Sequence, residues 1–318
     1  NKSGDMFKVF TPFKRAWLTY IKANGVKYTP KYANDTVQQE YDEASGLSSN
    51  WPLITDIESE VLPCFLNNKL LDYSRYRDFP ALSATSKLSP YLTIGALSSR
   101  YLLIQLLRKY PDILVATDTP QFSWLNELIW RDFYRHLLFH RPDLSCHRHY
   151  NPRYDNTVWP NHLPYFEAWK QARTGYPIVD AAMRQLVQTG WMHNRLRMVV
   201  ASFLTKHLLI DWRWGEQFFM QQLIDGDLAA NNGGWQWAAS TGCDAQPYFR
   251  IFNPITQSQK FDANGDFIRT YLPELNEVPT KHIHFPHQYL ADNNLTCYWP
   301  PVVEHKQARA RALAFYGK

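Results

Sequence analysis

Residues 225–240 bring together side chains that suit recognition of a flat, polar-edged molecule. The adjacent amides of Asn231 and Asn232 both donate and accept hydrogen bonds, which suits the edge of a heterocycle. Trp235 and Trp237 offer flat apolar faces, and paired glycines at 233–234 allow a ligand to approach the backbone closely. The segment therefore predicts a site for a planar cofactor or a nucleic-acid base.

Two other interpretations of this segment are a turn leading into a helix and a calcium-binding loop. Gly and Asn are common in turns, so the first stays open. Asp225 and Asp227 alternate as in an EF-hand, but the twelfth position is Gln236, where calcium binding requires a bidentate Glu. The calcium site is therefore excluded.

The hydroxyl-rich segment 85–90 leads towards a helix expected over 98–109. Hydroxyls and free backbone N–H groups near a helix start can bind an anion. Ser and Thr also favour such positions simply because they cap helices, so both interpretations stay open.

Two helices carry further candidate binding residues. In the helix expected over 121–140, Glu127 and Arg131 stand four residues apart with Trp130 beside them. This group is either a surface ion pair or a binding face. In the helix expected over 191–209, Arg195 and Arg197 look buried and so need an anionic partner, for which Asp225 and Asp227 are the candidates.

Other classes of site receive little support from the composition. The four cysteines are scattered, so neither a disulfide framework nor a zinc site is indicated, and a reducing cytosol is expected. No apolar run is long enough for a membrane span. The net charge of +5 permits a polyanionic partner. Since no catalytic triad is suggested, a bound cofactor is expected to carry the chemistry.

Periodicity predicts an all-α fold from residue 51 onwards, with no useful β-alternation. Residues 31–50 are polar and are expected to be a linker, and residues 1–50 look like an incomplete beginning. Residues 141–175 are irregular, and 245–262 is expected to be a long ordered loop. The helices are expected over 55–69, 98–109, 121–140, 177–190, 191–209 and 304–315.

Four long motifs, over 124–136, 174–184, 191–198 and 225–240, resemble the photolyase/cryptochrome family. Within it the chain is similar to bacterial class I cyclobutane pyrimidine dimer photolyases. The resemblance implies that 51–318 form a helical FAD-binding and repair domain. It also implies that 1–50 are the join to an N-terminal α/β antenna domain, which is otherwise missing here.

The resemblance implies specific cofactor roles. Arg197 and Asp225 would pair across the flavin ring, and Asn231 would face flavin N5. Trp235, Trp212 and Trp159 would form an electron-hopping chain that extends from the flavin to the surface. The other expected contacts to FAD are Tyr73, Thr85, Ser86, Lys87, Leu88, Ser89, Trp124, Gly226 and Asp227. Lys87 stands where relatives often carry Arg.

The resemblance also implies a substrate side, on which Glu127 would stabilise the dimer radical anion. Its other members would be Trp130, Asn194, Met198 and Trp237. Phosphates of DNA would be contacted by Arg77, Arg131, Arg195, Arg250, Gln257 and Lys260. The implied activity is light-driven repair of cyclobutane pyrimidine dimers by electron transfer from reduced, anionic FAD to a flipped-out dimer.

A cryptochrome photoreceptor that uses the same flavin without repair is the alternative. Asn231 argues against it, because plant cryptochromes tend to carry Asp there and insect ones Cys. A (6-4) photolyase would be expected to have His at 194 and 198, and the DASH type often lacks the tryptophan found here at 237. A folate or deazaflavin antenna pigment is expected only with the antenna domain. The protein is expected to be a monomer in the bacterial cytoplasm, associated with the nucleoid.

Overall fold

The computed structural model describes residues 4–28, 57–245 and 247–317, and these contain helices but no β-strand. The all-α prediction is therefore confirmed. The expected linker at 31–50 lies outside the described residues. Within them, no helix is both long and apolar enough to cross a lipid bilayer.

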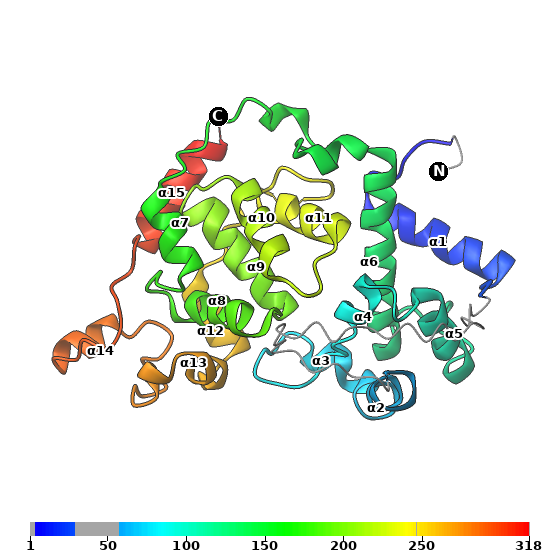
Figure 1. Ribbon diagram of the computed structural model, residues 1–318, viewed down its shortest axis with the longest axis horizontal. Helices are drawn as coiled ribbons and strands as arrows, with labels where there is room; N and C mark the ends of the chain where they lie inside the picture. The colour runs from blue at the N-terminus through cyan, green and yellow to red at the C-terminus, as the bar shows by residue number, and fades with distance from the viewer. Residues whose placement is uncertain (1–3, 29–56, 246, 318) are drawn as a thin grey trace, which may run out of the picture.

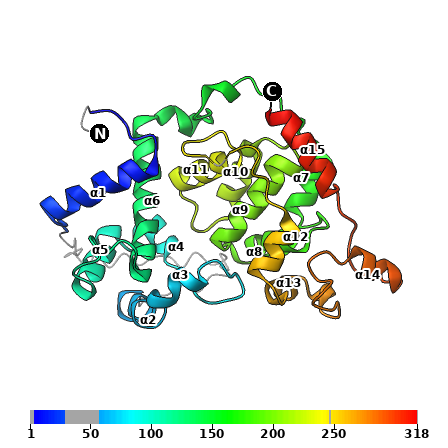
Figure 2. The same cartoon turned by 180° about the vertical axis from the view of Figure 1, so that it is seen from behind.

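The helices build two hydrophobic cores that meet along one long helix (Figures 1 and 2). The N-terminal core is formed by α1 (Phe10–Asn24), α2 (Leu62–Asn68), α3 (Tyr73–Tyr76), α4 (Ser89–Thr93), α5 (Ser99–Lys109) and α6 (Pro120–His140). The C-terminal core is formed largely by α7 (Leu163–Lys170), α8 (Pro177–Thr189), α9 (Asn194–Ser202), α10 (Trp212–Gln222), α11 (Leu228–Ala238), α13 (Asp266–Tyr271) and α15 (His305–Tyr316). Helix α11 packs against α6 at the seam.

Local sequence explains the long helix α6. Thr119 caps it by accepting a hydrogen bond from the Phe122 N–H, and Pro120 occupies the first turn, where its missing N–H costs nothing. Its buried apolar stripe is Phe122, Leu125, Ile129, Phe133 and Leu137. Packing of this stripe fixes which way the polar residues of α6 point.

The predicted helix over 177–190 is confirmed, but the one over 191–209 is divided. Gly190 ends α8 in the left-handed conformation. His193 then caps α9 by accepting from the Arg195 N–H, and α9 is followed by a π-helical turn, Phe203–His207. The cap explains why the segment cannot be one continuous helix from residue 191.

The loop predicted over 245–262 is wrong in its second half, which forms α12 (Pro254–Phe261). Asn253 accepts hydrogen bonds from two backbone N–H groups of the first turn, and Pro254 follows it. An Asn–Pro pair is a helix start signal, so the missed helix had a local signature. Short helices also occupy parts of 141–175 and of the segment after 262, including α14 (His287–Asp292).

Candidate functional site

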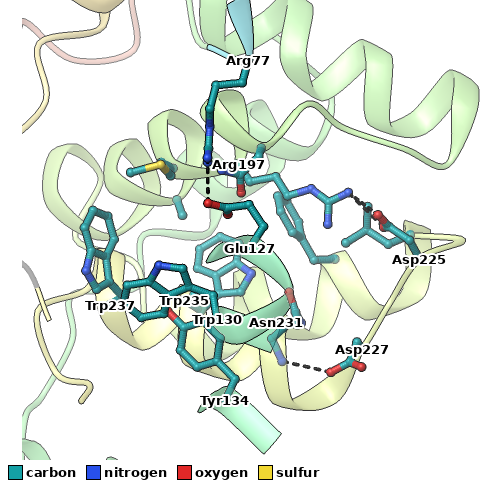
Figure 3. A pocket seen from close by; sticks show the side chains of 17 residues that line it. Arg77, Glu127, Trp130, Tyr134, Arg197, Asp225, Asp227, Asn231, Trp235 and Trp237 are labelled. Carbon is teal, nitrogen blue, oxygen red and sulfur yellow. Dashed lines mark hydrogen bonds and ion pairs between the residues drawn. The ribbon is translucent and has the colours of Figure 1, made fainter. Parts of the chain in front are cut away.

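A cavity of about 370 Å³ lies at the seam between the two cores, where α6, α9 and α11 converge. Figure 3 shows its side chains, with Trp237 and Asp225 towards opposite ends. Most of the predicted ring-binding and substrate residues line it. These are Arg77, Glu127, Trp130, Asn194, Arg197, Met198, Asp225, Asp227, Asn231, Trp235 and Trp237.

One side of the cavity is defined by the ion pair between Arg197 and Asp225, a pairing that the sequence had suggested. The Arg197 Nη2 lies 2.9 and 2.8 Å from the two oxygens of the buried Asp225 carboxylate. Arg197 Nε also donates to the Met192 carbonyl at 2.8 Å. Because the guanidinium is held at two points, it forms a fixed, planar wall rather than a mobile surface charge.

Glu127 does not pair with Arg131, the partner suggested by their spacing. Its carboxylate instead accepts a 2.7 Å hydrogen bond from Arg77 on the other side of the cavity mouth. Burial lowers the pKa of Arg77, but Glu127 more than offsets this and the pKa is raised overall. Arg131 donates to the Leu92 carbonyl at 2.8 Å. The carboxylate is therefore fixed beside the cavity by a charged hydrogen bond.

Asp227 acts as the N-cap of α11, accepting from the Ala230 N–H at 3.1 Å, and pairs with Arg135 at 2.8 Å. Burial raises its pKa, but these hydrogen bonds and the nearby arginines lower it overall. One turn later, the amide nitrogen of Asn231 donates to the Glu216 carbonyl at 2.9 Å. Its amide oxygen is therefore the group left to accept a hydrogen bond from a bound ring.

The two adjacent glycines of α11 have different surroundings. A Cβ at Gly233 would lie 2.2 Å from the ring of Tyr134, so that position is filled by packing. A Cβ at Gly234 would meet nothing within 4 Å, and Gly234 lines the cavity. The cavity is thus open against bare backbone here, which fits a flat ring system lying on α11.

Aromatic packing holds Trp130 of the substrate side and Trp235 of the predicted electron route. Trp130 is stacked face to face on Phe10 from α1, with centroids 3.6 Å apart, and lies 5.8 Å from Tyr134 one turn along α6. Trp235 is buried and packs edge-on against Phe219. The sequence interpretation missed Tyr134 and Phe10. The i, i+4 spacing from Trp130 could have indicated Tyr134, whereas the contact with Phe10 has no local signal.

Several predicted FAD contacts lie outside the lining of this cavity. Trp124 is buried against Phe65 at 5.0 Å, and Tyr73 lies beneath the guanidinium of Arg77 at 5.1 Å. The segment 85–89 leads into α4, whose first residue is Ser89. Its Lys87 has a left-handed backbone (φ 53°), and the Lys87 ammonium lies 5.6 Å from the ring centre of Trp191. Trp124 packs in the N-terminal core, and neither it nor Gly226 lines this cavity, so their contacts with FAD stay predictions.

The two remaining residues of the predicted electron route are buried in the C-terminal core. Trp212 is the first residue of α10, and its indole N–H points to His149 at 3.3 Å. Trp159 packs against Phe315 and Tyr316 of α15. Helices α10 and α11 pack together, so Trp212 and Trp235 stand on neighbouring helices.

The predicted DNA-contacting residues other than Arg131 have three kinds of surroundings. Arg77 and Arg195 are both about one-fifth exposed and are held in ion pairs, Arg195 with Asp78 at 2.9 Å. Arg250 and Lys260 are exposed. Gln257 has a buried side-chain oxygen without a hydrogen-bond partner among the described residues. Arg195 thus serves first to position Asp78 and the ring of Phe261, which lies 4.5 Å away.

Comparisons with known proteins agree on one family. The model of the FAD binding domain of DNA photolyase matches residues 124–318. The deoxyribodipyrimidine photo-lyase of Escherichia coli strain K12 is 49% identical over 98% of this chain and 68% of its own length. The deoxyribodipyrimidine photo-lyase of Vibrio cholerae is 49% identical over 99% of this chain and 69% of its own length.

Solved structures of this family share the fold. A class III photolyase from Agrobacterium tumefaciens has a TM-score of 0.80 at 38% identity, covering 99% of this chain and 69% of its own. A cryptochrome from Synechocystis has a TM-score of 0.73 at 35% identity, and the match covers 80% of this chain and 54% of the cryptochrome chain. With a cavity that suits a flat ring and relatives matched over nearly its whole length, the chain belongs to the DNA photolyase family.

Proposed function

We propose that this protein repairs cyclobutane pyrimidine dimers in DNA in a light-driven reaction that uses reduced FAD. The observation that carries this proposal is the cavity itself, in which a fixed Arg197–Asp225 pair and the open backbone at Gly234 adjoin Glu127, Trp130 and Trp237. The residues proposed to hold the flavin and those proposed to hold the dimer thus line one cavity. The relatives named photo-lyases support the same activity.

FAD fits the residues present. Arg197 and Asp225 would hold the ring from one side, and the Asn231 amide oxygen would accept a hydrogen bond from its edge. The backbone at Gly234 leaves room for the ring plane. When bound and reduced, FAD supplies an electron that light can drive into the dimer and that returns after the ring has opened.

The substrate side would bind the dimer through shape and charge. The indoles of Trp130 and Trp237 offer apolar walls to the two covalently linked thymines of a dimer taken out of the stack. Glu127, held by Arg77, is placed to hydrogen-bond a dimer carbonyl or N–H where negative charge develops. Closure of these groups around the dimer would also exclude water from the reacting bonds.

The direct test is repair of a UV-irradiated oligothymidine by the purified, reduced protein, in blue light and in darkness. We expect thymine absorbance to recover only in the light. Retained FAD without recovery would contradict repair and favour the alternative of a photoreceptor, a class represented among the structural relatives by the Synechocystis cryptochrome.

DNA carrying a pyrimidine dimer is the partner we propose for the exposed Arg250 and Lys260. Contacts of this kind release counterions, so binding of damaged duplex should weaken steeply as salt rises. A flat salt dependence would contradict this assignment. We further infer that residues 51–318 carry both sites, that the protein works as a monomer, and that it resides with the nucleoid in the cytoplasm. Gel filtration with and without DNA tests the monomer.

A further inference from the structure

The indole N–H of Trp212 has a specific acceptor, the Nδ1 atom of His149, at 3.3 Å. The two rings lie edge to face with centroids 5.8 Å apart, and the side chains are 0% and 2% exposed. An indole nitrogen can only donate, so Nδ1 must be the unprotonated nitrogen of a neutral imidazole. The structure therefore places a basic nitrogen of His149 against the indole N–H of Trp212, with both side chains buried from solvent.

The groups around His149 keep it neutral at rest yet tolerate a charge. Burial, with a smaller contribution from Arg213, lowers the pKa of His149 to about 4, while Asp211 and Asp155 act in the opposite direction. The Arg213 guanidinium also lies 5.7 Å from the centre of the Trp212 ring. Arg213 thus disfavours a positive charge on the Trp212 indole. A positive charge on the His149 imidazole is also disfavoured by Arg213, but the carboxylates of Asp211 and Asp155 stabilise it.

Trp159, the outermost residue of the proposed route, has the opposite environment. Its indole N–H is buried and has no hydrogen-bond partner among the described residues. Phe315 and Tyr316 cover its ring, leaving Trp159 6% exposed. An oxidised Trp159 therefore has no adjacent proton acceptor comparable to His149.

We propose that His149 accepts the indole proton of Trp212 when Trp212 is oxidised, and so holds the oxidised site at Trp212. The inference rests on the proposed function, in which Trp212 passes one electron through Trp235 to bound, light-excited oxidised flavin. The indole N–H bond breaks, its electron pair stays on the nitrogen, and the proton forms an N–H bond at Nδ1 of His149. A neutral indole radical and an imidazolium result, and both steps reverse when the electron returns.

This makes His149 a positioning residue for flavin photoreduction. Return of the electron to a deprotonated indole must be accompanied by return of the proton, so charge recombination is slowed. Repair by protein that is already reduced does not use this route. The inference and the repair activity can therefore fail separately.

Two variants separate hydrogen bonding from proton transfer. His149→Gln keeps a side-chain acceptor that cannot take up a proton, and His149→Leu removes the acceptor. His162→Gln changes an exposed histidine and is the matched control. In flash photolysis of protein with oxidised flavin, we expect wild type and control to give the neutral tryptophan radical, with slower formation in D₂O. Both His149 variants should give the tryptophan cation radical, which recombines at least several-fold faster.

A second measurement does not depend on the flavin. In protein labelled with ¹⁵N-tryptophan, the Trp212 indole N–H resonance, assigned by its loss in Trp212→Phe, should move upfield in His149→Leu and stay near its wild-type position in His149→Gln. Repair by chemically reduced protein should be unchanged in both variants. The inference is overturned if the neutral radical forms as in wild type without His149, if wild type forms none, or if the indole resonance does not respond to His149→Leu.

Discussion

The orientation of Glu127 in the site depends on a contact with a residue far from it in sequence. Its orientation comes from Arg77, fifty positions earlier in sequence, through a 2.7 Å charged hydrogen bond. Spacing along α6 favoured Arg131 as the partner, because a helical pattern reveals only pairs three or four residues apart on the same helix. The actual pair requires α3 and α6 to be packed together.

Glu127→Ala should lower the repair yield about tenfold, since one charged hydrogen bond is worth about 1.5 kcal/mol. FAD content should be unchanged, because Asn231 and the Arg197–Asp225 pair stay in place. Repair per absorbed photon and the flavin-to-protein absorbance ratio measure the two effects. Glu167→Ala, which removes a surface carboxylate paired with Lys170, is the control and should behave as wild type. Loss of flavin in Glu127→Ala would mean that Glu127 belongs to the cofactor site.

Adjacent glycines of α11 should respond in opposite ways to the same substitution. Gly234→Ala adds a methyl group to open cavity space and improves helix propensity, so the free energy of unfolding should rise by up to about 1 kcal/mol. Flavin affinity should fall at least tenfold, because the methyl group occupies the space of the ring.

Gly233→Ala forces its methyl group against Tyr134 and should destabilise the fold by about 1–3 kcal/mol. Urea unfolding and flavin titration measure the two quantities. Undiminished flavin binding by Gly234→Ala would place the ring elsewhere.

At the scale of elements, the predictable parts were those with complete local signals. Helices α6 and α8 could be placed because Pro120, Pro177 and Gly190 mark their ends and the apolar stripes are regular. Helix α12 had its Asn253–Pro254 start but a short, polar body, so its pattern was weak. The site residues of α11 and the pairing of Arg197 with an aspartate were indicated by side-chain chemistry, whereas the roles of Asn194 and Met198 on α9 came from the family resemblance. The contact between Trp130 of α6 and Phe10 depends on how α1 packs, which no spacing encodes.

Helix α1 should therefore matter for the substrate although it lies far from the site in sequence. Phe10→Leu keeps an apolar side chain but removes the stack 3.6 Å from Trp130, so the indole should lose its fixed orientation. Affinity for dimer-containing oligonucleotide should fall about three- to tenfold, the effect of one aromatic pair worth about 0.5–1.5 kcal/mol. Flavin content should stay constant. Phe13→Leu is the matched control. Phe13 lies in α1 like Phe10, but it packs on Phe133 and His136 of α6. Equal losses in the two variants would attribute the effect to α1 stability alone.

At the scale of the whole molecule, buried ionisable groups set how stability responds to acid. Burial lowers the pKa of His149 and His193 to about 4, and that of His207 to about 3. An unfolded chain has histidines with a pKa of about 6.5, so between that pH and about 4 it takes up protons that the folded protein does not. These histidines therefore reduce stability as pH falls through this window. Carboxyls whose pKa is raised by desolvation act in the opposite direction. They are the buried Asp180, Glu216 and Asp262 and the half-buried Asp132.

A single-histidine variant isolates one contribution from this sum. At about 1.4 kcal/mol per pH unit, protonation of residue 149 in the unfolded chain should cost wild type about 2 kcal/mol between pH 6.5 and pH 5. His149→Gln cannot take up that proton, so its loss of stability from pH 7 to pH 5 should be smaller by about this amount. Urea unfolding at the two pH values gives the difference directly. His162→Gln is the control and should show no such gain, because it replaces an exposed side chain. An identical pH dependence in wild type and His149→Gln would mean that residue 149 is protonated in the folded protein, which is incompatible with its acceptor bond to Trp212.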